Sequence, residues 1–314
     1  RRDRLDAGFR PVLHWHGRLT GIMTFCGSSG VAEQASVALF RAEVEAARTH
    51  AVGSHAERWA RAIAAWREDA QTNRAWLLFA TSLLCRTGGT RWAVDPFLLP
   101  ERIGQKPDYA AAAADLTPLD VVFLTHGHAD HFSPQLLTAL AHHNIAWVVP
   151  DHLHERLLSE TSIPPNRIRV ARAGEALEFL GIRATPFTGA HVSVPATGYL
   201  IEAAGKRLLF PGDTRSYDTS LQPCLDAVDV LFANLWLGRA TALQEHPPLT
   251  DALVRFCLAH QPARIVLMHL HEVGRSPDDY WTPRHAQLVA DAIAREAPRL
   301  PVTVPDTGDP IELG

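Results

Sequence analysis

The sequence has no apolar run of the roughly 18 residues that a membrane-spanning helix needs, and it has no block of Lys or Arg. Its 30 basic and 34 acidic side chains give a net charge of −4 when histidine is neutral. An acidic chain without a basic patch is a poor electrostatic match for nucleic acids or anionic membranes. We therefore expect neither a nucleic-acid partner nor a membrane span.

Cysteine is also scarce, and the four thiols form no Cys-x-x-Cys pair: Cys26, Cys85, Cys224 and Cys257. Isolated thiols of this kind are typical of a reduced, cytoplasmic protein. The chain begins with Arg1-Arg2 and shows no charged segment followed by an apolar one, which is the pattern of a secretion signal. It also lacks a Gly-x-Ser-x-Gly segment, so no serine nucleophile on a strand-to-helix turn is indicated.

Residues 1–75 predict a helical N-terminal extension. Good helix formers fill residues 31–50, and residues 55–70 place three apolar side chains at i, i+4 and i+7, namely Trp59, Ile63 and Trp66. Such a stripe indicates a face that packs on a neighbouring core. Upstream, His14 and His16 flank a tryptophan, and we expect them to be structural or to line the rim of a pocket.

The remaining residues, 76–314, predict one layered α/β domain. Residues 76–85 predict a strand that turns at Gly88-Gly89 into a return strand over residues 90–95. Further strands are predicted over residues 121–125, 146–149, 197–202, 206–210, 230–233 and 265–268. Helices are predicted between them, over residues 134–143, 151–160, 249–260 and 283–296. Strands and helices mixed in this way are typical of sheets covered by helices.

Several predicted strands lead into histidine or aspartate, namely those before His126, Asp213 and His269. In α/β proteins, ligands bind at the carboxyl ends of strands, because side chains there converge above a rigid sheet. We therefore expect histidines and aspartates that are distant in sequence to meet at one rim of the fold.

The strongest signal among the 17 histidines is the segment His126-Gly127-His128-Ala129-Asp130-His131. Neutral imidazole and carboxylate are good ligands for zinc and similar ions. In a tight loop, His126 and His128 can face one ion while Asp130 and His131 face another. Two ions about 3.5–4 Å apart can share a water molecule and lower its pKa toward 7. The segment therefore predicts a dinuclear metal site.

With this segment, the chain resembles the metallo-β-lactamase-fold hydrolase superfamily, whose five motifs can be placed in order. They are Asp95, the segment His126–His131, His191, Asp213 and His269. The resemblance implies an αββα sandwich, with two mixed sheets flanked by helices, over residues 76–314. It also implies two sets of ligands bridged by Asp213: His126, His128 and His191 for one ion, and Asp130, His131 and His269 for the other.

The same resemblance implies an activity. A hydroxide held by Asp213 and both ions would attack an ester, lactone, amide or phosphoester bond of a small molecule, and Asp130 would orient it or carry its proton. Asp95 would brace the metal loop from behind. His271 competes with His269 as a ligand, but His269 directly follows the strand, so we expect His271 to support the ligands instead. The cofactors would be two divalent ions, with zinc favoured and manganese or iron as alternatives.

The hairpin over residues 76–95 is similar to the branch containing L-ascorbate-6-phosphate lactonase and the N-acyl-phosphatidylethanolamine phospholipase D enzymes. Two other functions stay open: a mono-iron dioxygenase acting on a persulfide, and a scaffold without activity. Asp130 together with His131 favours two metal ions over one. Arg215 and Tyr217 either contact a polar or anionic substrate or are ordinary loop residues. The N-terminal extension either covers the metal face or joins two copies, which leaves a homo-oligomer open.

Overall fold

The structure is a computed structural model that describes residues 28–68, 72–221 and 227–314. His14 and His16 lie outside the described residues, as do Cys26 and Cys224. The other two thiols, Cys85 and Cys257, are free and buried. No described helix is both long enough and apolar enough to cross a membrane.

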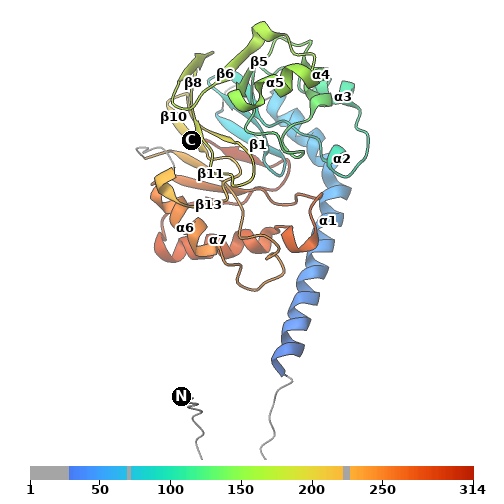
Figure 1. Cartoon of the computed structure of the whole chain (residues 1–314), viewed down its shortest axis with the longest axis vertical. Coiled ribbons are helices and arrows are strands. Elements are labelled where there is room, and N and C mark those ends of the chain that lie inside the picture. The colour runs from blue at the N-terminus through green and yellow to red at the C-terminus, as the bar shows by residue number, and fades with distance from the viewer. Residues whose placement is uncertain (1–27, 69–71, 222–226) are drawn as a thin grey trace, which may run out of the picture.

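Two seven-stranded mixed sheets pack face to face, and helices cover the outer face of each (Figure 1). The first sheet has the order β14 (Pro310–Glu312), β1 (Arg74–Phe79), β2 (Ser82–Thr87), β3 (Thr90–Val94), β4 (Val121–Phe123), β5 (Ala146–Pro150) and β6 (Ile168–Ala171). The second has the order β13 (Val302–Thr303), β12 (Arg264–Met268), β11 (Val230–Asn234), β10 (Lys206–Phe210), β9 (Thr197–Ala203), β8 (Ile182–Thr188) and β7 (Leu177–Phe179). The expected αββα sandwich is confirmed.

The α-helices are α1 (Ser28–Glu68), α2 (Leu99–Arg102), α3 (Tyr109–Asp115), α4 (Pro134–Leu140), α5 (Asp151–Glu160), α6 (Thr250–Ala259) and α7 (Pro283–Glu296). Three short 3-10 turns complete the described elements: η1 (Pro165–Arg167), η2 (Thr219–Leu221) and η3 (Pro277–Asp279). Helices α3, α4 and α5 pack on the first sheet, and α6 and α7 pack on the second.

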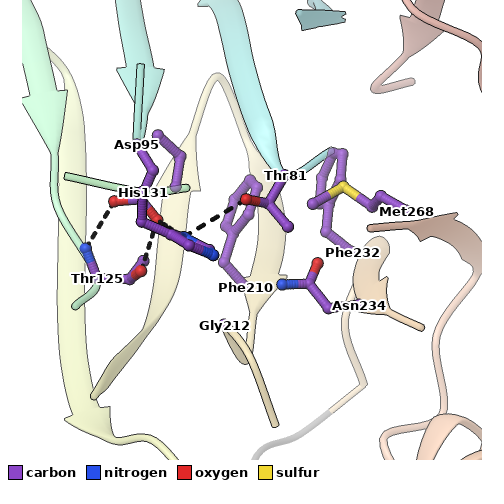
Figure 2. Close-up of a pocket in the computed structure, with 10 residues that line it drawn as sticks. Thr81, Asp95, Thr125, His131, Phe210, Gly212, Phe232, Asn234 and Met268 are labelled. Carbon is purple, nitrogen blue, oxygen red and sulfur yellow. Dashed lines mark hydrogen bonds and ion pairs between the residues drawn. The ribbon is translucent and has the colours of Figure 1, made fainter. Parts of the chain in front are cut away.

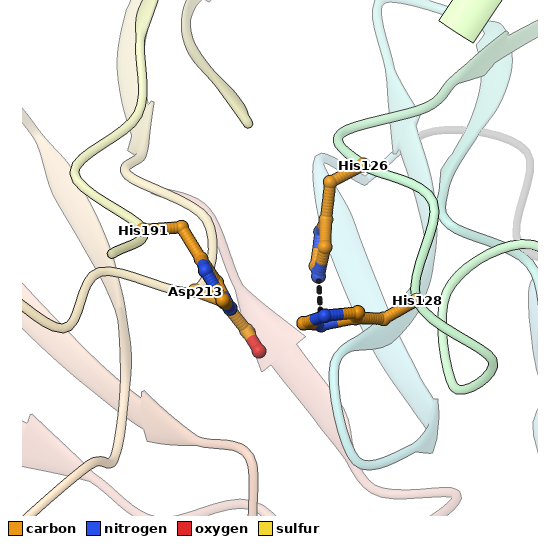
Figure 3. A group of neighbouring side chains, drawn as sticks. All are labelled: His126, His128, His191 and Asp213. Carbon is orange, nitrogen blue, oxygen red and sulfur yellow. Dashed lines mark hydrogen bonds between the residues drawn. The ribbon is translucent and has the colours of Figure 1, made fainter. Parts of the chain in front are cut away.

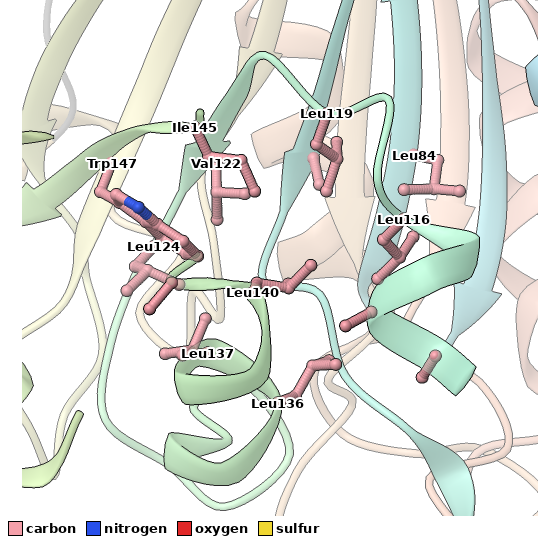
Figure 4. Close-up of a cluster of buried hydrophobic side chains, with 14 of the residues drawn as sticks. Leu84, Leu116, Leu119, Val122, Leu124, Leu136, Leu137, Leu140, Ile145 and Trp147 are labelled. Atoms are coloured by element: carbon pink, nitrogen blue, oxygen red, sulfur yellow. The ribbon is translucent and has the colours of Figure 1, made fainter. Parts of the chain in front are cut away.

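Alternating side chains of the strands fill two cores at once. In and after β4, Val121 and Phe123 point into the core between the sheets, whereas Val122 and Leu124 point to the outer core. This is the two-residue period of a strand that is buried on both faces. In the outer core, leucines of α4 pack over Val122 and its neighbours (Figure 4).

Helix α4 begins directly after the histidine-rich segment. The Ser133 hydroxyl accepts a hydrogen bond from the Leu136 amide at 3.2 Å and so caps the helix. Leu136, Leu137 and Leu140 are fully buried. A loop held between β4 and a capped, buried helix has little freedom to move, which positions its side chains.

Helix α1 is one continuous helix, where the sequence suggested two helical stretches. Its predicted apolar face is confirmed, because Ile63 and Trp66 are buried in the outer core of the first sheet and the Trp66 indole donates to the Cys85 carbonyl at 3.2 Å. Further toward its start, Arg48 donates to the carbonyls of Val273 and Arg275, in the loop after β12. The first turns of α1 extend away from the body (Figure 1).

The prediction of a single strand over residues 76–85 is wrong. The run forms two antiparallel strands, β1 and β2, because the chain turns at Ala80, whose φ is +45°. This turn has no glycine or proline to mark it within an apolar run. The predicted turn at Gly88-Gly89 and its return strand β3 are confirmed.

Candidate metal centre

The predicted site residues follow the carboxyl ends of strands in both sheets. Asp95 follows β3 and His126 follows shortly after β4, its parallel neighbour. Asp213 and His269 follow β10 and β12, on either side of the parallel strand β11. A hydrogen bond from the His269 amide to the Ala80 carbonyl, 2.9 Å long, ties the two sheets together at this rim. The convergence expected from the sequence is therefore present.

One group of neighbouring side chains consists of His126, His128, His191 and Asp213 (Figure 3). Each offers a nitrogen or oxygen atom, and these atoms lie within 4.8 Å of one another. His126 Nε2 lies 3.0 Å from His128 Nδ1. These are the three histidines, with the shared aspartate, that the resemblance implied for the first ion.

A second group consists of Asp130, His131 and His269. Asp130 Oδ2 lies 3.9 Å from His131 Nε2 and 3.7 Å from His269 Nε2. Asp213 stands between the two groups, since its Oδ1 lies 3.5 Å from His131 Nε2 and 3.6 Å from His269 Nδ1. The structure thus gathers all seven predicted ligands into two adjoining clusters.

Several ligand atoms in these clusters are buried and have no hydrogen-bond partner among the described residues: Asp130 Oδ2, His131 Nε2, His191 Nε2, Asp213 Oδ2 and His269 Nε2. A buried polar atom left without a partner costs about 1–3 kcal/mol, and more when it is charged. Five such atoms directed at one rim are explained if metal ions occupy it, because imidazole nitrogen and carboxylate oxygen are ligands of zinc, manganese and iron. The residues present therefore fit a metal centre.

The electrostatics of the histidines differ between the clusters. Burial lowers the pKa of His126 to about 2 and the pKa of His191 to about 4, so both rings are neutral and keep a lone pair. Burial also acts to lower the pKa of His131, but the carboxylates of Asp213 and Asp130 outweigh it and raise that pKa well above its usual value. A metal ion at His131 would replace this proton.

The Asp213 carboxylate stays ionised despite its burial. Burial alone would raise its pKa, but the nearby rings of His269 and His131 lower the pKa well below its usual range. The amide of Asn234 donates to Asp213 Oδ1 at 2.8 Å and fixes the orientation of the carboxylate. Asp213 is therefore a charged carboxylate of fixed orientation between the clusters.

Asp95 lies behind the histidine-rich loop and is hydrogen-bonded to it. Its carboxylate accepts hydrogen bonds from the Thr125 amide at 2.8 Å and the Thr125 hydroxyl at 2.5 Å (Figure 2). It also lies 2.7 Å from His131 Nδ1, which donates to it. Because Nδ1 carries the proton of this bond, Nε2 of His131 is the atom left to bind a metal.

The structure separates His269 from His271. Both have a positive φ, +69° and +57°, and only His269 belongs to a ligand cluster. The ring of His271 lies beside Tyr280, with Nδ1 3.4 Å from the phenol oxygen. No hydrogen bond joins His271 to a ligand side chain in the described chain, so its supporting role stays a prediction.

Sequence reasoning missed three residues that surround the ligands. Asn234 ends strand β11, and the rule that identified Asp213 and His269 would have found it. Arg275 Nη2 lies 3.7 Å from Asp130 Oδ2, and Arg275 is itself paired with the buried carboxylate of Glu272. Neither Glu272 nor Arg275 belongs to a recognisable motif, because the loop after β12 has no regular pattern.

The two residues singled out after Asp213 have different roles. The Tyr217 hydroxyl donates to the Trp236 carbonyl at 2.7 Å and its ring packs against Phe256, so Tyr217 is structural. Arg215 lies over the Trp236 ring, with its guanidinium carbon 4.3 Å from the ring centroid. Its contact with a substrate therefore stays a prediction.

Comparison with known proteins gives a consistent result. A family model described as the β-lactamase superfamily domain matches residues 90–270. A curated relative, a UPF0173 metal-dependent hydrolase from Roseiflexus sp. (strain RS-1), is 29% identical over 123 residues, or 39% of this chain and 49% of the relative. The match thus spans about half the length of that relative.

Solved structures share the fold at low sequence identity. Igni18, a metallo-hydrolase from Ignicoccus hospitalis, has a TM-score of 0.54 at 15% identity, covering 77% of this chain and 98% of its own. YhfI from Bacillus subtilis, a metallo-β-lactamase fold protein, has a TM-score of 0.55 at 15% identity, covering 77% and 100%. CmlA, a diiron β-hydroxylase from Streptomyces venezuelae, has a TM-score of 0.54 at 19% identity, covering 78% and 55%.

Proposed function

The chain belongs to the β-lactamase superfamily, and from this membership we propose that it is a dinuclear metal-dependent hydrolase of small molecules. The observation that carries the proposal is the group of buried, unpartnered ligand atoms at the rim of the two sheets. A scaffold protein without a metal would gain nothing from seven metal-ligating side chains gathered at one rim.

We assign the ligands according to the two clusters. His126, His128 and His191 would hold one ion, and Asp130, His131 and His269 would hold the other. Asp213, which lies beside both clusters, would bridge the ions. Zinc is the favoured metal because histidine nitrogen supplies most of the ligands.

Two divalent ions at this site would polarise a carbonyl or phosphoryl oxygen and activate a water molecule as the nucleophile. The chain's own groups would supply the rest. Asp130 would orient the attacking water or carry the proton that this water loses, as the family resemblance implies. Arg275, whose Nη2 lies 3.7 Å from Asp130 Oδ2, keeps the carboxylate oriented and favours its charged form.

The substrate we propose is an ester, lactone, amide or phosphoester, and a lactone is the first to test. The resemblance of the β1–β3 region to the lactonase branch supports this choice. Helix α1 contacts the loop after β12 through Arg48, so the N-terminal extension would help to position the loop that carries His269 and Arg275.

The test combines metal analysis with a screen for hydrolysis. Protein loaded with zinc or manganese should cleave at least one member of a panel of lactones, esters, amides and phosphodiesters. His126→Ala should abolish this cleavage, whereas His143→Ala, which changes a histidine in the turn after α4 and outside both clusters, should not. Cleavage that survives in the His126→Ala variant would refute the assignment.

An iron enzyme is the second candidate, because CmlA, a diiron β-hydroxylase, has the same fold. Iron as the retained metal, with oxygen consumption and no hydrolysis, would favour it over the hydrolase.

A further inference from the structure

Beside the proposed metal centre lies Arg215, whose guanidinium forms no ion pair with a carboxylate of the described chain. It is half-buried, two residues after Asp213, and its backbone amide donates to the Ala190 carbonyl at 3.0 Å. Within residues 28–68, 72–221 and 227–314, no carboxylate lies within 4 Å of its guanidinium, and the guanidinium donates no hydrogen bond. Its described contact is the face of Trp236.

The neighbouring arginines differ from Arg215 in this respect. Arg275 lies over the same indole, 5.7 Å from its centroid, but it is paired with Glu272. Arg239 is mostly exposed and lies 4.0 Å from Asp279. Of these three arginines, Arg215 is the one that forms no ion pair in the described chain, so its guanidinium can meet a ligand.

Arg215 also lines a small hollow together with two of the proposed metal ligands, Asp213 and His269. Thr214, Asn234 and Trp236 complete its lining. Contact with an aromatic face holds a guanidinium by its charge and leaves its N–H groups able to donate. The planar fork of these donors matches the oxygens of a carboxylate or a phosphate.

We propose that Arg215 binds an oxyanion of the substrate, a carboxylate or a phosphate group, beside the bond that is cleaved. This proposal rests on the proposed hydrolase function and narrows the class of substrate to anionic small molecules. Trp236 positions the guanidinium, and Arg275, which is already paired, takes no part in binding the anion.

Two anionic probes, inorganic phosphate and succinate, test the proposal without any knowledge of the substrate. Their affinities are measured by calorimetry on zinc-loaded wild type, on Arg215→Met and on the matched control Arg239→Met, with succinamide as a neutral probe. Metal content is measured on the same samples. Loss of a charge-assisted contact should weaken binding of one anion on the order of 10-fold or more in Arg215→Met. Arg239→Met should bind as wild type does, and succinamide should not distinguish the variants.

The probe whose affinity falls more in Arg215→Met shows whether the oxyanion of the substrate is a phosphate or a carboxylate. Equal affinities in wild type and Arg215→Met would overturn the proposal while leaving the hydrolase function intact, and so would equal losses in both arginine variants. If Arg215→Met does not fold, Arg215→Lys replaces it. Anion affinity equal to that of wild type in Arg215→Lys would overturn recognition by the planar donors of the guanidinium. Failure of wild type to take up zinc, manganese or iron would overturn the hydrolase function, and this proposal with it.

Discussion

Replacing Asp95 with asparagine should weaken metal binding by about 10- to 100-fold, the usual effect of losing a partner behind a metal ligand. The substitution keeps the size of the side chain and changes its hydrogen bonding. All three groups that face the Asp95 carboxylate are donors: the Thr125 amide, the Thr125 hydroxyl and His131 Nδ1. The NH2 group of asparagine must therefore face one of them. When it faces His131, the ring proton moves to Nε2 and blocks the atom proposed to bind the metal.

The affinity is measured by competition between metal-free protein and a chromophoric zinc chelator. Thr81→Val is the matched control, because the Thr81 hydroxyl lies 3.4 Å from the same Nδ1 atom and makes only a long contact. Its zinc affinity should stay close to that of wild type. Unfolding in urea without metal tests the fold separately, and the lost charge-assisted bond should cost about 1.5–3 kcal/mol. Wild-type zinc affinity in Asp95→Asn would refute the reasoning.

Four other substitutions test three further predictions. His269→Ala should reduce the zinc content of the protein, as measured by elemental analysis, while His271→Ala should leave it unchanged. The reverse result would mean that His271, and not His269, is the ligand. His285 is buried with its pKa lowered to about 4, so the folded state binds fewer protons than the unfolded state between pH 4 and 6.5. The free energy of unfolding should therefore fall as the pH falls through this window, and His285→Gln should remove about 2 kcal/mol of the difference between pH 7 and pH 5 in urea titrations. Gly198→Ala should destabilise the fold by about 1–3 kcal/mol, because its Cβ would collide with the Phe187 ring in the neighbouring strand; an unchanged urea midpoint would show that the ring can move aside.

The gathering of the ligands was predictable because it follows from topology. A histidine or aspartate placed just after a buried strand lies at the strand's carboxyl end, and parallel neighbours bring such ends together. His126, Asp213 and His269 obey this rule, and Asn234, at the end of β11, would have been found by applying it once more. His191 was located only through the resemblance, since no local feature marks a lone histidine as a ligand.

Other features could not be predicted, for physical reasons. The turn at Ala80 interrupts an apolar run without glycine or proline, and only tertiary contacts, such as the bond from the His269 amide, hold it in place. Helix α1 continues through Gly53 because packing at its C-terminal half outweighs the low helix propensity of one glycine. The pairing of Glu272 with Arg275 depends on a loop whose path is set by contacts with α1.

Metal stoichiometry tests the central claim most directly. Protein is purified without added metal or chelator, reconstituted with zinc and then dialysed, and its metal content per chain is measured by elemental analysis in wild type and in an Asp213→Ala variant. About two divalent ions per wild-type chain, with a clear loss in the variant, is the result that two clusters bridged by Asp213 predict. No retained metal in wild type, or full retention in Asp213→Ala, would contradict it.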